Sequence, residues 1–333
     1  MTNDDIPKKQ VYGVGLIGCG KIGEKRVASL PPSCILRGVY DVRLDTARAL
    51  AARFSAGLCE THDDLLRRDD IDIIIIATTH DHLAPLTTAA LKQGKHVFVE
   101  KPGGRNTIEL LQLQEVAEQQ KMCVAIGFNH RFHPAVAAAK SIIDSGNHGR
   151  LLWIRGRYGH GGRVGYESEW RASRQVSGGG ELMDQGCHLI DLTLHLCGKV
   201  QLDYARLTTS FWPMEVEDNA FLSLTTAEGA TVWLHVSWTE WKNMFSLEIT
   251  LERAKIEVNG LGGSYGTEVL TLHEMKPEMG PPLTSHTEFP GVDDSWRLEL
   301  LDFLARIDGK SAQGADLPSA IAVHEIIAEA YRR

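Results

Sequence analysis

The chain has 333 residues, 43% of them hydrophobic and 23% charged, and a net charge of −8. This length suggests two domains, and the net negative charge argues against nucleic acid or an anionic membrane as the main partner. No apolar run approaches the roughly 20 residues that a membrane-spanning helix needs. The first ten residues lack the apolar core of a signal peptide, and the six cysteines lack paired CxxC spacing. We therefore expect a cytoplasmic protein with reduced thiols.

A glycine-rich turn follows the first apolar run, where residues 18–23 read GCGKIG. Gly18 permits a tight turn, Gly20 leaves no side chain between the backbone and a ligand, and Gly23 lets a helix pack close to the strand. The unsatisfied N–H groups and the dipole at the start of that helix favour a pyrophosphate. A second apolar strand and Asp41 follow about 20 residues further on, so the pattern predicts a dinucleotide site.

From residue 11 to residue 127, short apolar runs alternate with helical patterns, which is typical of βαβ units in a parallel sheet. The expected strands are 11–17, 35–40, 71–77, 96–99 and 124–127. The expected helices are 22–30, 45–54, 82–92 and 107–121, with Pro85 in a first turn where proline is tolerated. The nearly all-apolar run 71–77 predicts a strand that is covered on both faces. The sequence therefore predicts an α/β fold that begins with a doubly wound parallel sheet, a Rossmann domain, over residues 1–128.

In such a sheet, ligands bind beyond the carboxyl ends of the strands. This rule selects the cofactor-binding candidates Gly18, Gly20, Lys21, Ile22, Asp41, Thr78, Thr79, Glu100 and Asn129. The Asp41 carboxylate can accept hydrogen bonds from the adenosine ribose and would repel a 2′-phosphate, which favours NAD over NADP. Arg43 could instead pair with that phosphate, and Asp41 could simply cap a helix. Lys101, which lies between a strand end and Pro102, either reaches into the cleft or is a solvated surface lysine.

After residue 128, strand-like runs joined by short turns favour antiparallel pairing. The expected strands are 151–157, 204–211, 220–226, 231–238, 245–251, 255–258 and 269–272. The expected helices are 133–145, 181–196, 294–306 and 318–331, and the stretch 276–290, with four prolines, is expected to be an irregular loop. We therefore predict an α+β domain for substrate binding and oligomerisation over residues 129–333, with one open, mainly antiparallel sheet. Its C-terminal helices could pack back on the first domain.

A polar stripe marks the helix expected over residues 181–196. Asp184, His188, Asp191 and His195 recur at steps of four, three and four residues, which places them on one face. Gly186, poorly suited to a helix interior, would give a ligand close access to this face. The stripe could be a solvent-exposed face, a metal site or an acid–base pair in which a carboxylate orients a histidine. No complete ligand set is evident in the sequence, so we expect no metal.

The segment 151–174 contains five arginines and five glycines. A flexible loop with this charge could bind an acidic group on the substrate, such as a phosphate, a nucleotide diphosphate or a carboxylate. The alternative is that these charges only cover a loop or a subunit interface. The substrate contacts that we predict are Lys101, Arg131, His160, Trp170, Arg171, Asp184 and Asp191.

Four segments together resemble the glucose–fructose oxidoreductase / inositol dehydrogenase / rhizopine catabolism (Gfo/Idh/MocA) family. They are GLIGCGKIG at 15–23, GKHVFVEKP at 94–102, GFNHRFHP at 127–134 and GGGELMDQGCHLIDL at 178–192. The resemblance covers nearly the whole chain. It implies an NAD(P)-dependent oxidoreductase that acts on sugars, sugar derivatives or cyclitols, commonly as a homodimer or homotetramer assembled through the sheet of the second domain.

By motif position, the resemblance implies three catalytic residues. Lys101 would touch the substrate hydroxyl beside the nicotinamide, His188 would accept its proton, and Asp184 would be a hydrogen-bond partner of the substrate, with Asp191 a further contact. Residues 77–83, ATTHDHL, depart from the Ala-Thr-Pro-Asn pattern of many relatives, because they lack the proline and place the histidine one position early. The expected function is hydride transfer between nicotinamide and a carbinol carbon; the alternative is a regulatory NAD(P)-binding protein of the same fold without turnover.

Overall fold

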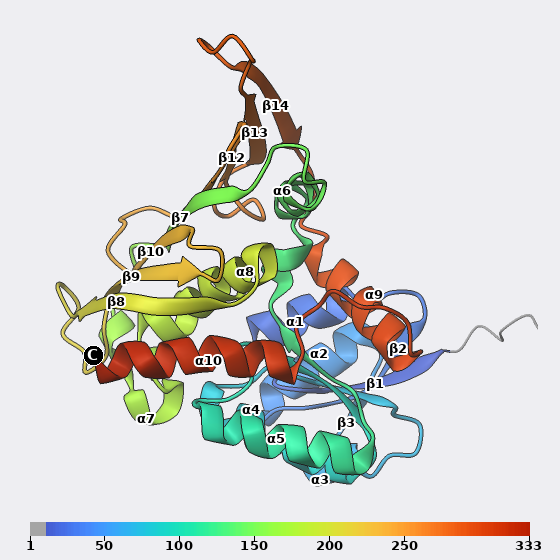
Figure 1. The fold of residues 1–333 in the computed structure, drawn as a ribbon. Helices are drawn as coiled ribbons and strands as arrows, with labels where there is room; N and C mark the ends of the chain where they lie inside the picture. The colour runs from blue at the N-terminus through green and yellow to red at the C-terminus, as the bar shows by residue number, and fades with distance from the viewer. Residues whose placement is uncertain (1–10) are drawn as a thin grey trace, which may run out of the picture. The chain divides into compact units, whose positions relative to one another are not determined.

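A computed structural model describes residues 11–333. The polar stretch 1–10, in which no signal peptide is expected, lies outside the described residues. Contacts divide the chain into two compact units. Unit 1 runs to Gly104 and adds Glu109–Gly127 and Trp296–Leu317, and unit 2 comprises Arg105–Ile108, Phe128–Ser295 and Pro318–Arg333. The helices and strands of both units are labelled in Figure 1.

Unit 1 contains the predicted parallel sheet. Its strands are β1 (Tyr12–Ile17), β2 (Cys34–Tyr40), β3 (Gly57–Leu58), β4 (Ile73–Ile76), β5 (His96–Glu100) and β6 (Val124–Gly127), in the order β3-β2-β1-β4-β5-β6. The intervening helices are α1 (Lys21–Ala28), α2 (Leu44–Phe54), α3 (His62–Leu66), α4 (His80–Lys92) and α5 (Thr107–Gln120). Every pairing in this sheet is parallel, so the doubly wound architecture is confirmed.

Two details of unit 1 differ from the sequence-based expectation. The short elements β3 and α3 were not predicted, because two and five residues are too few to show a periodic pattern. Helix α4 begins at His80, after Thr79 as the N-cap residue, and not at residue 82. Pro85 is therefore the sixth residue of the helix, in its second turn, and the prediction that it lies in the first turn is wrong.

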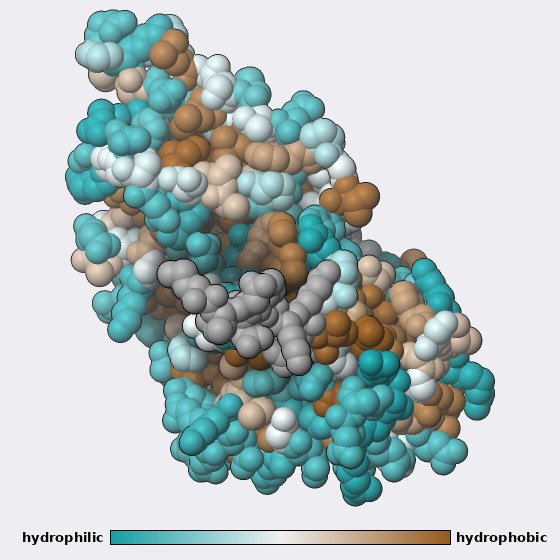
Figure 2. Space-filling view, turned by 90° about the vertical axis from the view of Figure 1, so that its right-hand side faces the viewer, coloured by the Kyte–Doolittle hydropathy of each residue, from teal (hydrophilic) through white to brown (hydrophobic). Residues whose placement is uncertain are grey.

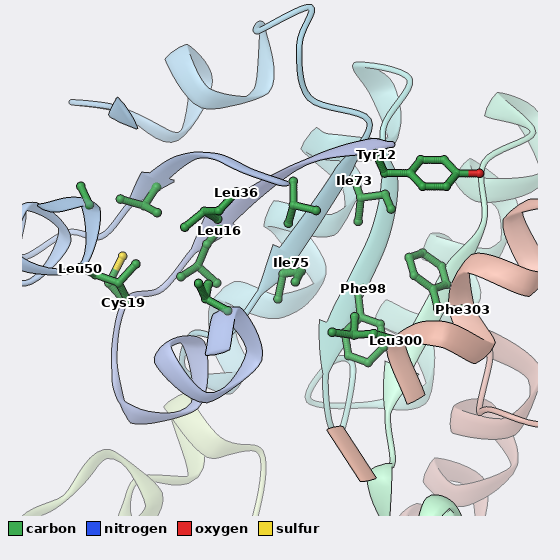
Figure 3. Close-up of a cluster of buried hydrophobic side chains, with 14 of the residues drawn as sticks. Tyr12, Leu16, Cys19, Leu36, Leu50, Ile73, Ile75, Phe98, Leu300 and Phe303 are labelled. Atoms are coloured by element: carbon green, nitrogen blue, oxygen red, sulfur yellow. The ribbon is translucent and has the colours of Figure 1, made fainter. Parts of the chain in front are cut away.

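A hydrophobic core cluster of unit 1 joins the sheet to helices α1, α2 and α9 (Ser295–Ile307), and Figure 3 shows part of it. Leu16, Ile75 and Phe98 are fully buried, and the Phe98 ring packs edge-on against Phe303 of α9 with 5.6 Å between ring centroids. All four residues of β4 are at most 2% exposed. The prediction of a central strand covered on both faces is therefore confirmed.

Unit 2 is built around an eight-stranded sheet. Its strands are β7 (Leu151–Gly159), β8 (Val200–Thr208), β9 (Asn219–Thr226), β10 (Thr231–Ser237), β11 (Met244–Leu251), β12 (Ala254–Asn259), β13 (Glu268–Glu274) and β14 (Leu283–Phe289). The order is β14-β13-β12-β11-β7-β10-β9-β8. Only β7 and β10 pair in parallel, so the prediction of a mainly antiparallel sheet is confirmed for the described residues.

The remaining elements of unit 2 are helical. They are η1 (Asn129–Phe132), α6 (Pro134–Asp144), η2 (Tyr166–Ser168), η3 (Trp170–Ala172), α7 (Arg174–Ser177), the π-helix η4 (Leu182–Gly186), α8 (Cys187–Cys197) and α10 (Leu317–Arg332). Helix α10 lies beside β8 (Figure 1), where Arg333 donates a hydrogen bond to the carbonyl oxygen of Leu202.

Strand β14 corrects the expectation of an irregular loop over residues 276–290. It pairs with β13, and Leu283 to Glu288 are all exposed. The four prolines flank this strand, at 277, 281, 282 and 290, and none lies inside it. Proline has no backbone N–H to donate, but these prolines lie outside the paired residues. They therefore remove no hydrogen bond from the pairing of β14 with β13. The proline content therefore misled the prediction.

The two faces of the unit 2 sheet differ in exposure. On β10, Val232, Leu234 and Val236 are at most 3% exposed, whereas Trp233 between them is 43% exposed. This alternation is typical of a sheet with one face in the core.

The face of the molecule drawn in Figure 2 is mostly hydrophilic, with smaller hydrophobic patches. Across residues 11–333, no helix is both long and apolar enough to cross a membrane.

Candidate functional site

The glycine turn of unit 1 has the geometry of a phosphate cradle. Gly18 adopts a φ of +94°, and its N–H donates to the carbonyl oxygen of Tyr40 at 2.9 Å. A Cβ on Gly23 would lie 1.9 Å from the Gly18 oxygen, whereas a Cβ on Gly20 would meet nothing within 4 Å. Gly20 therefore leaves open space at the start of α1, where backbone N–H groups favour an anion. The backbone of this glycine turn therefore fits the pyrophosphate of a dinucleotide.

Asp41 connects the end of β2 to this turn. Its Oδ2 accepts a hydrogen bond from the Cys19 N–H, and its Oδ1 accepts one from the Arg43 N–H, both at 2.8 Å. Arg43 is the N-cap residue of α2, and its side chain makes no capping hydrogen bond, so Asp41 lies two residues before the cap position of that helix. A carboxylate has further lone pairs, and Asp41 can still accept a bond from a ribose hydroxyl.

The other cofactor candidates of unit 1 also follow strand ends. Lys21 and Ile22 are exposed in the first turn of α1. Thr78 and Thr79 are half-buried between β4 and α4, and the Thr79 hydroxyl donates to the Asp81 carboxylate at 2.6 Å. The departure from the family pattern at this loop therefore leaves two hydroxyl groups at the end of β4.

Glu100, the last residue of β5, accepts a hydrogen bond from the Arg26 Nε at 2.5 Å. Arg26 is fully buried and also donates to Glu299 of α9 at 2.7 Å. The Phe98 and Trp296 rings each lie 4.3 Å from its guanidinium carbon. Sequence analysis missed Arg26, because a charged residue in a helix gives no sign of burial. The half-buried Lys101 follows this network directly, in a cis peptide bond to Pro102.

In unit 2, the predicted helix over residues 181–196 is two elements, η4 and α8. Asp184, His188 and Asp191 are 7%, 6% and 0% exposed, so the interpretation as a solvent-exposed face is wrong. The role predicted for Gly186 is also wrong. A Cβ there would lie 2.8 Å from Leu182 and 3.3 Å from Val236 of β10, so this glycine allows close packing on the sheet.

Glu217 and Tyr331 anchor the start of η4. Oε1 of Glu217 accepts hydrogen bonds from the N–H groups of Gly180 and Leu182, at 3.0 and 3.1 Å, and from the Tyr331 hydroxyl at 2.8 Å. A Cβ on Gly180 would lie 2.0 Å from the Glu217 carbonyl oxygen, and one on Gly179 would lie 1.9 Å from the Tyr331 hydroxyl. The glycines of the GGGELMDQG segment are therefore required by packing.

Two carboxylates of the polar stripe pair with arginines. Asp184 accepts from the Arg171 Nε at 3.0 Å, and the Arg171 guanidinium lies over the Trp170 ring at 4.4 Å. Asp191 accepts two hydrogen bonds from Arg131, at 2.8 and 2.5 Å. Five residues predicted to contact the substrate thus lie in two separate clusters of unit 2. The second pair, fully buried at Asp191, joins η1 to α8.

The His188 ring lies among other rings. The His130 ring stacks on it with 3.8 Å between centroids, and the Phe128 ring meets it edge-on at 5.6 Å. Asn129, predicted to bind the cofactor, is 5% exposed, and its amide nitrogen donates to the Ser295 hydroxyl. Sequence analysis quoted His130 within a motif but did not select it. The signal that could have selected His130 is its position next to Arg131, a predicted substrate contact, in a motif that also contains His133.

His160 follows β7, and its Nδ1 accepts a hydrogen bond from the Gly162 N–H at 2.9 Å. Burial lowers its pKa. It is half-buried and meets the Tyr166 ring edge-on at 5.7 Å. Because Nδ1 accepts, the hydrogen of the neutral imidazole lies on Nε2, which can only donate a hydrogen bond.

Four of the five arginines between residues 151 and 174 pair with carboxylates of unit 2. The pairs are Arg155–Glu248, Arg157–Glu240, Arg163–Glu169 and Arg171–Asp184. The positive charge of this segment is therefore largely compensated, which favours the interpretation as charge cover over a site for an acidic substrate.

Among residues 11–333, no group of three or more His, Cys, Asp and Glu side chains is arranged to hold a metal ion. All six cysteines are free thiols. Burial raises the pKa of the Cys19 thiol, beside the glycine turn, to about 12. The thiol is therefore protonated at neutral pH and does not add a negative charge to the proposed phosphate cradle.

Comparison with known families identifies both halves of the chain. Residues 12–128 match the model of the Gfo/Idh/MocA oxidoreductase family with its NAD-binding Rossmann fold, and residues 136–265 match the model of the Gfo/Idh/MocA C-terminal domain. The chain belongs to the Gfo/Idh/MocA family, as its motifs indicated, and its first unit carries the NAD-binding Rossmann fold.

Individual relatives are more distant. Levoglucosan dehydrogenase of Pseudarthrobacter phenanthrenivorans is 32% identical over 213 residues, which cover 60% of this chain and 55% of that protein. Inositol 2-dehydrogenase of Gluconacetobacter diazotrophicus is 30% identical over 148 residues, 43% of this chain and 44% of that protein. The chain thus matches about half the length of these relatives. A levoglucosan dehydrogenase structure, in complex with NADH and levoglucosan, superposes with a TM-score of 0.86 at 23% identity and covers 97% of both chains. That similarity shows the fold.

Proposed function

We propose that this protein is an NAD-dependent dehydrogenase that oxidises a carbinol of a sugar or cyclitol, or reduces the corresponding ketone. The observation that carries the proposal is the buried η4–α8 segment, with His188 and Asp184 in one family motif, on a chain whose other unit has an open glycine cradle. The names of the relatives, levoglucosan and inositol dehydrogenases, support a polyol substrate.

His188 is the proposed acid–base. An imidazole titrates near neutral pH and can take the proton of the reacting hydroxyl or return it to a ketone oxygen. Asp184, which is held by Arg171, is the proposed hydrogen-bond partner of the substrate. Lys101 is proposed to stabilise the oxygen as it gains negative charge. When bound, the nicotinamide of NAD accepts or supplies the hydride.

The variants His188→Ala and Lys101→Met test these roles. Loss of a positioned acid–base lowers the rate by roughly 10²–10⁴-fold. We expect His188→Ala to lower kcat to this extent while the dissociation constant for NAD, measured by fluorescence titration, stays within about twofold. Near-normal turnover in both variants would refute the mechanism. Binding of NAD without reduction across a panel of sugars and cyclitols would favour the regulatory alternative.

Asp41 is proposed to select NAD over NADP. Its carboxylate lies against the glycine turn, where it can accept a bond from the ribose and repel a 2′-phosphate. We expect the wild-type protein to bind NADH more tightly than NADPH, and Asp41→Asn to reduce this preference by at least tenfold. Asp45→Asn is the matched control, because it removes an exposed carboxylate of α2 that pairs with Arg48, and it should leave NADH binding unchanged. Tighter binding of NADPH by the wild type would overturn the assignment.

An uncharged substrate is proposed because the arginines of segment 151–174 are mostly paired. One spectrophotometric assay of NAD reduction can compare a free sugar with its phosphorylated and nucleotide-linked forms. We expect the free sugar or cyclitol to give the highest kcat/KM. A preference of more than tenfold for an anionic form would show that these arginines exchange their partners for the substrate.

We further infer a homodimer or homotetramer assembled through the outward face of the unit 2 sheet. Trp233 and Tyr204 are 43% and 47% exposed there, and apolar aromatic surface of this kind marks association sites. Sedimentation velocity of the wild type should show an assembly, and Trp233→Glu should dissociate it. A wild-type monomer would exclude this inference.

A further inference from the structure

His130 and His188 form a ring stack within unit 2. Their planes are inclined by 20°, and each residue is 6% exposed. Three further rings enclose His130 edge-on: Tyr158 of β7 at 5.3 Å, Phe245 of β11 at 6.1 Å and His133 at 5.6 Å. The position and tilt of the His188 ring are therefore set by His130 on one face.

A chain of hydrogen bonds fixes the tautomer of His130. The Ser295 hydroxyl donates to the Asp293 carboxylate at 2.5 Å, so the oxygen of Ser295 accepts from the Asn129 amide nitrogen at 2.8 Å. The Asn129 amide oxygen then faces His130 Nδ1 at 3.2 Å. An amide oxygen only accepts, so Nδ1 of His130 carries a hydrogen. A further proton can enter His130 only at Nε2, and it would make the ring cationic.

We propose that His130 is a positioning residue for His188. It holds the plane of the His188 ring, and it lowers the affinity of His188 for a proton because the stacked pair shares a single positive charge. A neutral His130 presents a π face on which a charged His188 can lie. Two charged rings at 3.8 Å repel, so the pair takes up its two protons in separate steps. The proposal rests on the assignment of His188 as the acid–base.

The charged groups around the stack are already paired within unit 2. Between η1 and α6, His133 Nδ1 lies 3.0 Å from Glu268 of β13, and its Nε2 lies 4.0 Å from Asp293. On α8 and η4, Asp191 pairs with Arg131 and Asp184 pairs with Arg171.

Tyr158 of β7 lies beside the stack, and its ring contacts that of Tyr265. Burial raises the pKa of both phenols, so both are neutral. Phe128 and Phe245 carry no charge. At 3.8 Å between centroids, each histidine ring exerts a direct electrostatic effect on the protonation of the other.

Two variants separate the charge of His130 from its shape. His130→Phe keeps a ring for stacking but cannot be protonated. His130→Asn keeps a nitrogen donor towards Asn129 but removes the ring. Both remove the shared charge, so both should move the acid limb of the pH profile of kcat/KM to higher pH, by about one pH unit for groups coupled this closely. His130→Asn should also lower kcat at the plateau severalfold, while His130→Phe should not.

The same titration can be followed without turnover. Histidine-labelled protein is titrated by NMR, with the His188 signal assigned by its loss in His188→Gln. We expect a two-step curve for His188 in the wild type and a single step at higher pH in His130→Phe. His195→Gln, on the same helix, is the control and should leave the curve unchanged.

The outcomes distinguish the two proposals. If His188 titrates at the same pH in the wild type and in both His130 variants, the positioning role is overturned, whatever the activity. If the curves change as expected but no polyol is oxidised, the proton sharing stands and the proposed function fails.

Discussion

The two units hold their predicted site residues by different means. In unit 1, backbone contacts define the site: the Gly18 N–H bonds to the carbonyl of Tyr40, and the Ala77 N–H bonds to that of Ile17. In unit 2, side chains define it: Glu217 anchors the start of η4, and Arg131 and Arg171 hold two carboxylates of the polar stripe. A site made by strand ends follows from sheet topology, whereas a site on a helix depends on individual side chains from distant segments.

Arg26 is an exception to this comparison and should show the largest effect on stability. It is a buried cation between Glu100 and Glu299 in the unit that otherwise relies on backbone contacts. Arg26→Met leaves two buried carboxylates without their partner, which costs about 3–5 kcal/mol. Urea denaturation measures this loss. Arg53→Met, which breaks an exposed pair with Glu24, should cost less than about 1 kcal/mol. Equal effects of the two variants would show that the Arg26 network contributes little.

The glycine turn tests the backbone side of the comparison. Gly23→Ala forces a Cβ against the Gly18 carbonyl and should destabilise the protein by about 1–3 kcal/mol. Gly20→Ala enters open space, so the free energy of unfolding should change by less than about 0.5 kcal/mol, while NADH binding measured by fluorescence weakens at least tenfold. Unchanged NADH binding by Gly20→Ala would remove the phosphate cradle from the proposed site.

Tyr331→Phe tests the side-chain anchor of unit 2. The variant removes one of three hydrogen bonds to the buried Glu217 Oε1 and should cost about 1–2 kcal/mol in urea denaturation. Because Glu217 also bonds to Gly180 and Leu182, the start of η4 should loosen, and kcat should fall with little change in NADH affinity. Tyr40→Phe, at a tyrosine of unit 1 whose ring lies 5.9 Å from that of His62, is the matched control. A loss of stability without a change in kcat would show that the anchor does not act on the site.

The smallest effect concerns His195, at the end of the polar stripe. Burial, with a smaller contribution from the Arg131 charge, lowers its pKa to about 4. Between pH 6.5 and 4 the unfolded chain binds a proton that the folded protein does not, so stability is lost as the pH falls through this range. Urea denaturation at pH 7 and pH 5 should show a smaller loss for His195→Gln than for the wild type. The exposed His62→Gln should match the wild type; equal pH dependence of all three proteins would contradict the burial effect.

The amino-acid pattern was sufficient for the architecture of unit 1. The run of isoleucines in β4 and the GCGKIG turn require no distant partner to be interpreted, because strand burial and glycine geometry are local properties. Strand-like runs joined by short turns likewise predicted the mainly antiparallel sheet of unit 2. The local pattern failed for β14, where flanking prolines concealed an edge strand.

Sequence alone also selected Asp184 and His188 by their spacing, but it left three environments open for them. The tertiary structure excluded the solvent-exposed face and supplied the neighbours: Arg171 for Asp184 and the His130 ring for His188. These contacts join residues that are 13 and 58 positions apart in the chain. Charge pairing and ring stacking depend on distances in space, which a one-dimensional pattern does not encode, and for this reason only the folded chain decided them.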